Sequence, residues 1–161
     1  MKIILFLSLL IWVIPGFGKV KIQKPRSQHV TAFAIIVDEM TLEKTGGAVE
    51  AYRDALEADG LSTYIVSGNW KNPDEVKAEI IKLNKRKPVL EGVVFIGDIP
   101  VALIRNAQHM TTAFKMNEDE FPFPESSVPS DRFYDDLHLT FDFICQDSVN
   151  TSHFYYKLRE D

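Results

Sequence analysis

Five aspartates stand where the fold of the chain could bring carboxylates together. Asp38 and Asp98 each follow an apolar run, in "AFAIIVD" and "VVFIGD", while Asp131, Asp135 and Asp136 crowd the segment "SSVPSDRFYDD". If both runs are parallel strands of one open α/β sheet, Asp38 and Asp98 lie on the edge where such sheets bind ligands. The five carboxylates are therefore candidates for holding a basic peptide or a cation such as calcium, which prefers oxygen ligands.

The alternative for these aspartates is a purely structural role. Aspartate commonly caps strand ends and turns by accepting backbone hydrogen bonds. No loop with the spacing of an EF-hand occurs in the chain. Calcium thus remains one hypothesis beside capping, and no other cofactor is expected.

A thiol nucleophile is the other chemistry to consider, because the chain has one cysteine, Cys145. Residues 137–145 alternate apolar and polar side chains, which predicts a half-buried strand with Cys145 on its core face. Burial there would raise the pKa of the thiol and leave it inert. His138 alternates to the opposite face, and His109 is the base to consider if the thiol proves exposed. We predict no catalytic residue.

Other catalytic and binding motifs are missing from the sequence. No Gly-x-Ser-x-Gly element surrounds the serines of "SSVPSD", and neither a P-loop nor a dinucleotide fingerprint occurs. The net charge is −5 without a long basic block, which argues against nucleic acid as a partner.

Three apolar runs alternate with two amphipathic segments, which predicts a βαβαβ unit. The strands are expected at 32–37, 63–66 and 93–96, and the helices at 44–59 and from Pro73, capped by Asn72, to a stop at Pro88. The fold class is thus α/β, a partial doubly wound sheet with the first strand in the middle (order 2-1-3). After Asp98 we expect a proline-rich loop, a short strand at 133–134, the strand at 137–145 and the start of a further element, together a hairpin-like extension.

The first residues, "MKIILFLSLLIWVIPGFG", have the pattern of a secretory signal peptide. Residues 1–18 are predicted to be removed on export, with an uncleaved anchor as the alternative. Residues 19–30 are polar and are expected to form a loose lead-in, and residues 31–161 the domain. After cleavage no membrane association is expected.

Three stretches together resemble the gingipain-like, caspase-fold family of cysteine peptidases. They are "VVFIGDIPVALIRNAQ", the Ser-Asp-x-x-Tyr pattern of Ser130, Asp131 and Tyr134, and "LTFDF". The resemblance implies a caspase-like sheet, a cysteine nucleophile and a histidine base that is usually followed by glycine. None of the four histidines here precedes a glycine. The resemblance therefore covers only the amino-terminal, non-catalytic portion of such a domain.

Two functions follow as expectations. The first is an exported, gingipain-like fragment without proteolysis of its own, whose partner is a missing carboxy-terminal catalytic part or another protein. The second is a self-contained binding module that uses the acidic strand-end edge. An incomplete sheet should expose an apolar edge, whereas a complete module should not.

Overall fold

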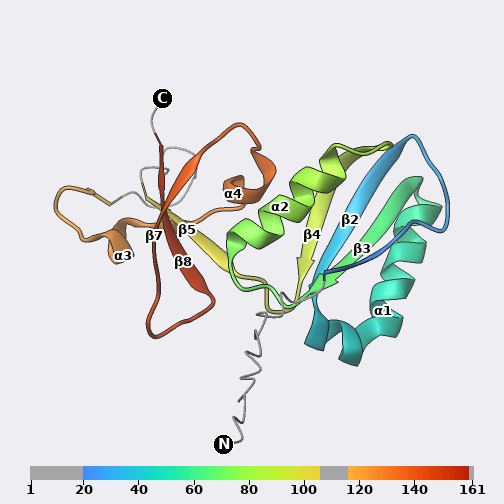
Figure 1. Cartoon of the computed structure of the whole chain (residues 1–161), viewed down its shortest axis with the longest axis horizontal. Helices are drawn as coiled ribbons and strands as arrows, with labels where there is room; N and C mark the ends of the chain where they lie inside the picture. The colour runs from blue at the N-terminus through green and yellow to red at the C-terminus, as the bar shows by residue number, and fades with distance from the viewer. Residues whose placement is uncertain (1–19, 106–115, 160–161) are drawn as a thin grey trace, which may run out of the picture.

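The structure is a computed structural model that describes residues 20–105 and 116–159 as a mixed α/β protein with two sheets (Figure 1). The predicted signal peptide and His109 lie outside these residues. None of the helices in the described ranges is both long and apolar enough to span a bilayer.

The first sheet contains the predicted βαβαβ unit. Strands β2 (Thr31–Asp38), β3 (Leu61–Gly68) and β4 (Val89–Ile96) run parallel in the order β3-β2-β4, which confirms that the first predicted strand lies in the middle. Alternate side chains of β2 point to opposite faces, as the pleat requires. Ala34 and Ile36 pack in one cluster with helix α2 (Pro73–Asn84), and Ile35 and Val37 pack in another with α1 (Glu39–Ala58).

Helix α1 begins five residues earlier than the sequence pattern predicts. Asp38 is its N-cap, and the first turns carry polar residues and two glycines, which conceal the helical period. Helix α2 begins as predicted, because the Asn72 side chain accepts a hydrogen bond from the Glu75 backbone N–H at 2.9 Å and Pro73 occupies the first turn.

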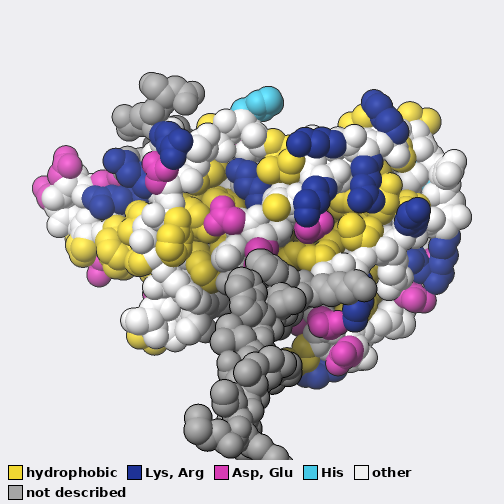
Figure 2. All heavy atoms as spheres, viewed as in Figure 1, with side chains coloured by type: hydrophobic (Ala, Val, Ile, Leu, Met, Phe, Trp, Pro, Cys, Tyr) yellow, Lys and Arg dark blue, Asp and Glu magenta, His cyan; other side chains and the backbone are white. Residues whose placement is uncertain are grey.

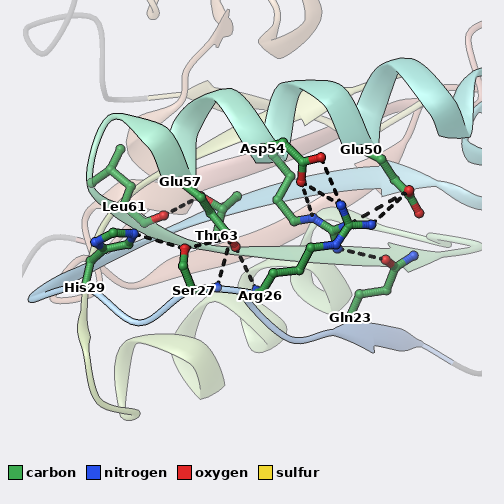
Figure 3. Close-up of polar contacts among 10 residues, drawn as sticks. Gln23, Arg26, Ser27, His29, Glu50, Asp54, Glu57, Leu61 and Thr63 are labelled. Atoms are coloured by element: carbon green, nitrogen blue, oxygen red, sulfur yellow. Dashed lines mark hydrogen bonds and ion pairs between the residues drawn. The ribbon is translucent and has the colours of Figure 1, made fainter.

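The lead-in is not loose, contrary to our prediction for residues 19–30. Its strand β1 (Lys21–Gln23) pairs antiparallel with β3, and Ile22 packs against the core. Beyond β1, the buried carboxylate of Glu57 on α1 accepts hydrogen bonds from Arg26 N at 2.9 Å, from Ser27 N at 3.0 Å and from the Ser27 hydroxyl at 2.7 Å (Figure 3). A buried charge on the helix thus holds a segment that has no regular structure.

Glu57→Gln is expected to lower the free energy of unfolding at pH 7 by about 1.5–3 kcal/mol, the range for hydrogen bonds to charged groups. Burial alone would raise the pKa of Glu57, but hydrogen bonds from Ser27 and Arg26 outweigh it and hold the pKa below its usual 4.5. A lowered carboxylate pKa stabilises the fold above pH 4.5, and this contribution is lost as the pH falls through the lower, folded-state pKa.

Urea unfolding at pH 7 and at pH 3 measures both effects. The variant should lose less stability than the wild type between the two pH values, and Glu120→Gln, at an exposed position, is the control. Equal acid sensitivity of Glu57→Gln and wild type would show that the carboxylate does not hold the lead-in.

The second sheet has the order β6-β5-β8-β7 and is larger than the predicted hairpin extension. Its strands are β5 (Val101–Arg105), β6 (Val128–Pro129), β7 (Phe141–Gln146) and β8 (His153–Leu158), with two short helices, α3 (Phe123–Ser126) and α4 (Arg132–Asp135). Strands β7 and β8 form the hairpin, while β8 also pairs parallel with β5. The strand predicted at 133–134 was wrong: both side chains are buried on α4, one turn of helix.

Strand β7 starts four residues later than predicted and contains an irregularity that moves Cys145. Phe143 lies opposite Tyr156, but Cys145 lies opposite Tyr155, with a register shift between them. Because opposed residues share a face and Tyr155 and Tyr156 point to opposite faces, Cys145 leaves the face of Phe143. The predicted core-facing thiol was therefore wrong, and Cys145 is half-buried beside Tyr155.

Candidate functional site

The carboxyl ends of β2 and β4 are joined by one carboxylate. Asp38, the last residue of β2, accepts a hydrogen bond from Thr41 N at 2.9 Å through Oδ1 and from Asp98 N at 2.8 Å through Oδ2. The two aspartates that were predicted to meet at this edge therefore do so. The capping role, however, belongs to the Asp38 side chain, and Asp98 contributes its backbone.

Gly97 makes this contact possible. Its φ of 85° lies in the left-handed region, and a Cβ at this position would lie 1.9 Å from Asp38 Oδ2. The glycine of the Gly-Asp pair is thus required both for the turn and for the close approach of the carboxylate.

Asp38 stays ionised in this setting. Burial raises its pKa, but hydrogen bonds from the Thr41 hydroxyl and from the backbone N–H groups of Thr41, Asp98 and Met40 outweigh burial and lower it overall. The N-terminus of α1 adds favourable partial positive charge, so the carboxylate is held in place as an anion.

A pocket of about 310 Å³ opens beside these strand ends. It is lined by Asp38, Glu39, Met40, Glu43, Gly68, Asn69, Trp70 and Asp98. Four of these residues carry carboxylates, and no Lys or Arg is among the described residues that line it. The arrangement favours a cation, and the Trp70 side chain, which is only 8% exposed, forms part of the pocket wall.

Within the pocket the carboxylates differ in availability. Asp38 is engaged with α1, and Glu39 forms an exposed ion pair with Lys21 at 2.5 Å. Glu43 and Asp98 are exposed. The Trp70 ring is fixed, because its indole N–H donates to the carbonyl of Val37 at 3.2 Å. The pocket therefore combines a rigid wall with two accessible negative charges.

The remaining predicted site residues lie elsewhere. Asp131 lines a hollow beside Phe95, and Asp135 lines another beside Leu90 on the free side of β4. The Asp136 carboxylate accepts a hydrogen bond from His138 N at 3.1 Å. The five aspartates thus do not form one acidic edge.

A lysine occupies the neighbourhood of Asp135 and Asp136. Lys77 on α2 is half-buried, with Nζ 4.9 Å from the ring centres of both Phe133 and Phe141 and 3.4 Å from the carbonyl of Leu139. Burial lowers the pKa of Lys77, although the charges of Asp136, Asp74 and Asp135 oppose this. These two aspartates balance a cation of the protein itself.

Geometry for a metal ion is missing from the described residues. No group of three or more His, Cys, Asp or Glu side chains there is arranged to hold one. Calcium binding stays a prediction without support from the arrangement of these carboxylates.

Histidine pairing of Cys145 is likewise not seen in the described part of the chain. His29 bonds to the Ser27 hydroxyl and His153 to the Asn150 amide, each at 3.0 Å. On the Cys145 face, Asp147 accepts hydrogen bonds from the Tyr155 hydroxyl and from two backbone N–H groups that close the β7–β8 turn. These contacts of Asp147 stabilise the β7–β8 turn, and they do not activate the thiol.

Glu39, Glu43 and Trp70 are pocket residues that the sequence analysis missed. The rule that placed Asp38 and Asp98 at the strand ends also applies to "SGNW" after β3, and it would have found Trp70. Glu39 and Glu43 required the true start of α1, which the two glycines concealed.

No family model, curated protein or solved structure matches the chain. The gingipain-like resemblance therefore stays a prediction from the quoted motifs.

Proposed function

We propose that this chain is an exported, gingipain-like binding domain without proteolysis of its own, which holds the basic side chain of a peptide in its strand-end pocket. The observation that carries the proposal is the pocket with four carboxylates and a fixed indole. Its 310 Å³ lies at the lower end of the range for small-ligand pockets, about 300–1,000 Å³, which suits one Lys or Arg side chain.

The absence of proteolysis rests on separate evidence. Cys145 has no histidine bonded to it in the described residues, and none of the four histidines precedes a glycine. A catalytic cysteine and histidine would then belong to the carboxy-terminal catalytic part, or to the other protein, that the resemblance implies. Thiol-dependent cleavage of peptides by the chain alone, abolished by Cys145→Ala, would contradict the proposal.

Trp70 provides the test of the pocket. With Trp12→Phe in the full chain, Trp70 is the only tryptophan, so its fluorescence reports on this pocket. N-acetyl-lysine amide and N-acetyl-arginine amide should change the emission saturably, and N-acetyl-glutamine amide should not. These single residues are too short to pair with a strand.

Removing the two accessible charges should weaken this binding. We expect the double variant Glu43→Gln with Asp98→Asn to bind either basic probe about tenfold more weakly, because two partly exposed ion pairs of about 0.7 kcal/mol each are lost. Asp98→Asn leaves the backbone N–H that bonds Asp38 intact. Glu120→Gln with Asp119→Asn, which removes two negative charges at exposed positions outside the pocket, is the control, and an equal effect there would contradict the pocket assignment.

A further inference from the structure

Strand β4 is the longer of the two free edges of the first sheet. It pairs with β2 on one side, and no strand of the described residues pairs with the other. Its first half contains Glu91 at a β-bulge, where the register against β2 shifts, whereas residues 92–96 (GVVFI) have the apolar composition of a central parallel strand, with neither charge nor proline. The opposite edge, β1, is by contrast three residues long and begins with a lysine.

The side chains of β4 are only partly covered. Val93 and Phe95 pack toward α2, and Val94 and Ile96 toward α1, but none of the four is fully buried. Helix α1 packs mainly on β3 and β2. Figure 1 shows β4 as the strand of the first sheet nearest to the second sheet, with α2 beside it.

Two apolar hollows follow the free side of β4, one on each side of Tyr134. The first, of about 110 Å³, is lined by Leu90, Gly92 and Val93 together with Ile80 and Leu137. The second, of about 200 Å³, is lined by Phe95 and Gly97 together with Ile99, Pro100 and Pro129. Tyr134 lines both and is fixed, because its ring packs on Phe95 at 4.8 Å and its hydroxyl donates to the carbonyl of Pro100.

The charges at these hollows have one sign. Glu91 and Asp135 line the first hollow and Asp131 the second, and no Lys or Arg lines either of them in the described part of the chain. Asp135 is balanced by Arg132 at 3.7 Å and by the nearby Lys77, so the remaining negative charges at the hollows are those of Glu91 and Asp131. Elsewhere on the face that carries α2, Lys and Arg side chains are widely spread (Figure 2).

We propose that β4 is a docking edge for an extended peptide segment of another protein, which adds a strand beside β4 and carries apolar residues flanked by Lys or Arg. From Gly92 to Ile96, beyond the bulge at Glu91, the main chain of β4 supplies hydrogen bonds at every second residue, and alternate apolar side chains of the peptide enter the hollows on either side of Tyr134. The basic flanks face Glu91 and Asp131. A second copy of this chain suits the edge less well, because a symmetric pairing would gather these acidic residues from both copies.

The test uses the full chain and a fluorescent, capped peptide of alternating valine and threonine with two lysines at each end. We expect saturable binding by fluorescence anisotropy and slower hydrogen exchange at alternate amides of β4. The same peptide with N-methylated alternate amides should not bind, because it cannot pair with a strand. Equal binding of the methylated peptide, or no binding of the first peptide, overturns the proposal.

Charge reversal tests the chemistry of the partner. Glu91→Lys with Asp131→Lys should weaken binding of the lysine-flanked peptide about tenfold and strengthen that of a glutamate-flanked peptide. Both positions are exposed, so the fold should persist, and Glu120→Lys is the control with the same change at one exposed site. If the double variant still prefers the lysine-flanked peptide as strongly as wild type does, the proposal of a basic partner is overturned.

Two further results separate this edge from the alternatives. If hydrogen exchange at the β4 amides slows as the protein concentration rises, without any peptide, a second copy of the chain is the occupant and the proposal is overturned. The pocket variants Glu43→Gln and Asp98→Asn should leave binding of the strand peptide unchanged. The inference therefore does not rest on the proposed function and can fail or succeed separately.

Discussion

Phe133→Ala is expected to lower the free energy of unfolding by about 3–5 kcal/mol, the range for truncating a buried phenylalanine. The Phe133 side chain is 1% exposed. Its ring centre lies 4.6 Å from that of Tyr156 on β8 and 5.1 Å from that of Phe141 on β7, and Lys77 of α2 lies over it. The Phe133 side chain thus joins α2, which packs on the first sheet, to both strands of the β7–β8 hairpin.

The measurement is chemical denaturation followed by circular dichroism and by tryptophan fluorescence. The two signals should move together, because the cluster that contains Phe133 runs through both sheets from Ala34 to Tyr156. Phe143→Ala is the matched control, since Phe143 is 58% exposed, and it should cost less than about 1 kcal/mol. Equal losses in the two variants would show that Phe133 does not join the sheets.

The first sheet follows from local patterns in the sequence. The runs that end at Asp38 and at Gly97 are continuous and apolar, as expected for strands covered on both faces, and Asn72 and Pro73 mark a helix start. The meeting of Asp38 with Asp98 follows in turn, because parallel neighbours end on the same edge. Each of these features can be predicted from a short stretch of sequence, without knowledge of distant contacts.

The second sheet could not be predicted in this way. Strand β8 pairs parallel with β5 about fifty residues earlier, and no local period encodes such a partner. The displacement of Cys145 depends on one extra residue in β7, which alternation alone does not reveal. Phe133 and Tyr134 are two adjacent aromatic residues, a pattern that also fits a short strand, but they lie on the single turn of α4.

The acidic site was predicted in part for the same reason. Asp38 and Asp98 end strands whose order was predicted, whereas Asp131 and Asp135 are placed by α4 and its contacts with α2. Their separation from the first pair depends on the path of the chain after Asp98, which local patterns do not encode. Sequence proximity of Asp131, Asp135 and Asp136 therefore indicated a cluster, but not where the cluster lies.

Gly97→Ala is expected to cost more than about 2 kcal/mol of unfolding free energy, because two penalties add. An alanine at φ 85° costs about 1–2 kcal/mol from the left-handed conformation alone. Its Cβ would also lie 1.9 Å from Asp38 Oδ2 and 2.4 Å from Thr41 Oγ1. Neither group can yield easily, since the carboxylate is held by the backbone N–H groups of Thr41 and Asp98.

Gly46→Ala separates this effect from the general cost of replacing glycine. Gly46 lies inside helix α1, and a Cβ there meets nothing within 4 Å. Alanine is the better helix former by about 1 kcal/mol, so this variant should be more stable than wild type. Urea midpoints of the two variants should therefore move in opposite directions.

A double-mutant cycle with Asp38→Ala then tests whether the clash lies at the carboxylate. Asp38→Ala alone removes the N-cap of α1 and should cost about 1–2 kcal/mol. If the alanine at position 97 collides with this carboxylate, the double variant should lose less than the sum of the two single losses. Additive losses would mean that the alanine does not collide with the carboxylate, and that backbone strain and the contact with Thr41 make Gly97 necessary.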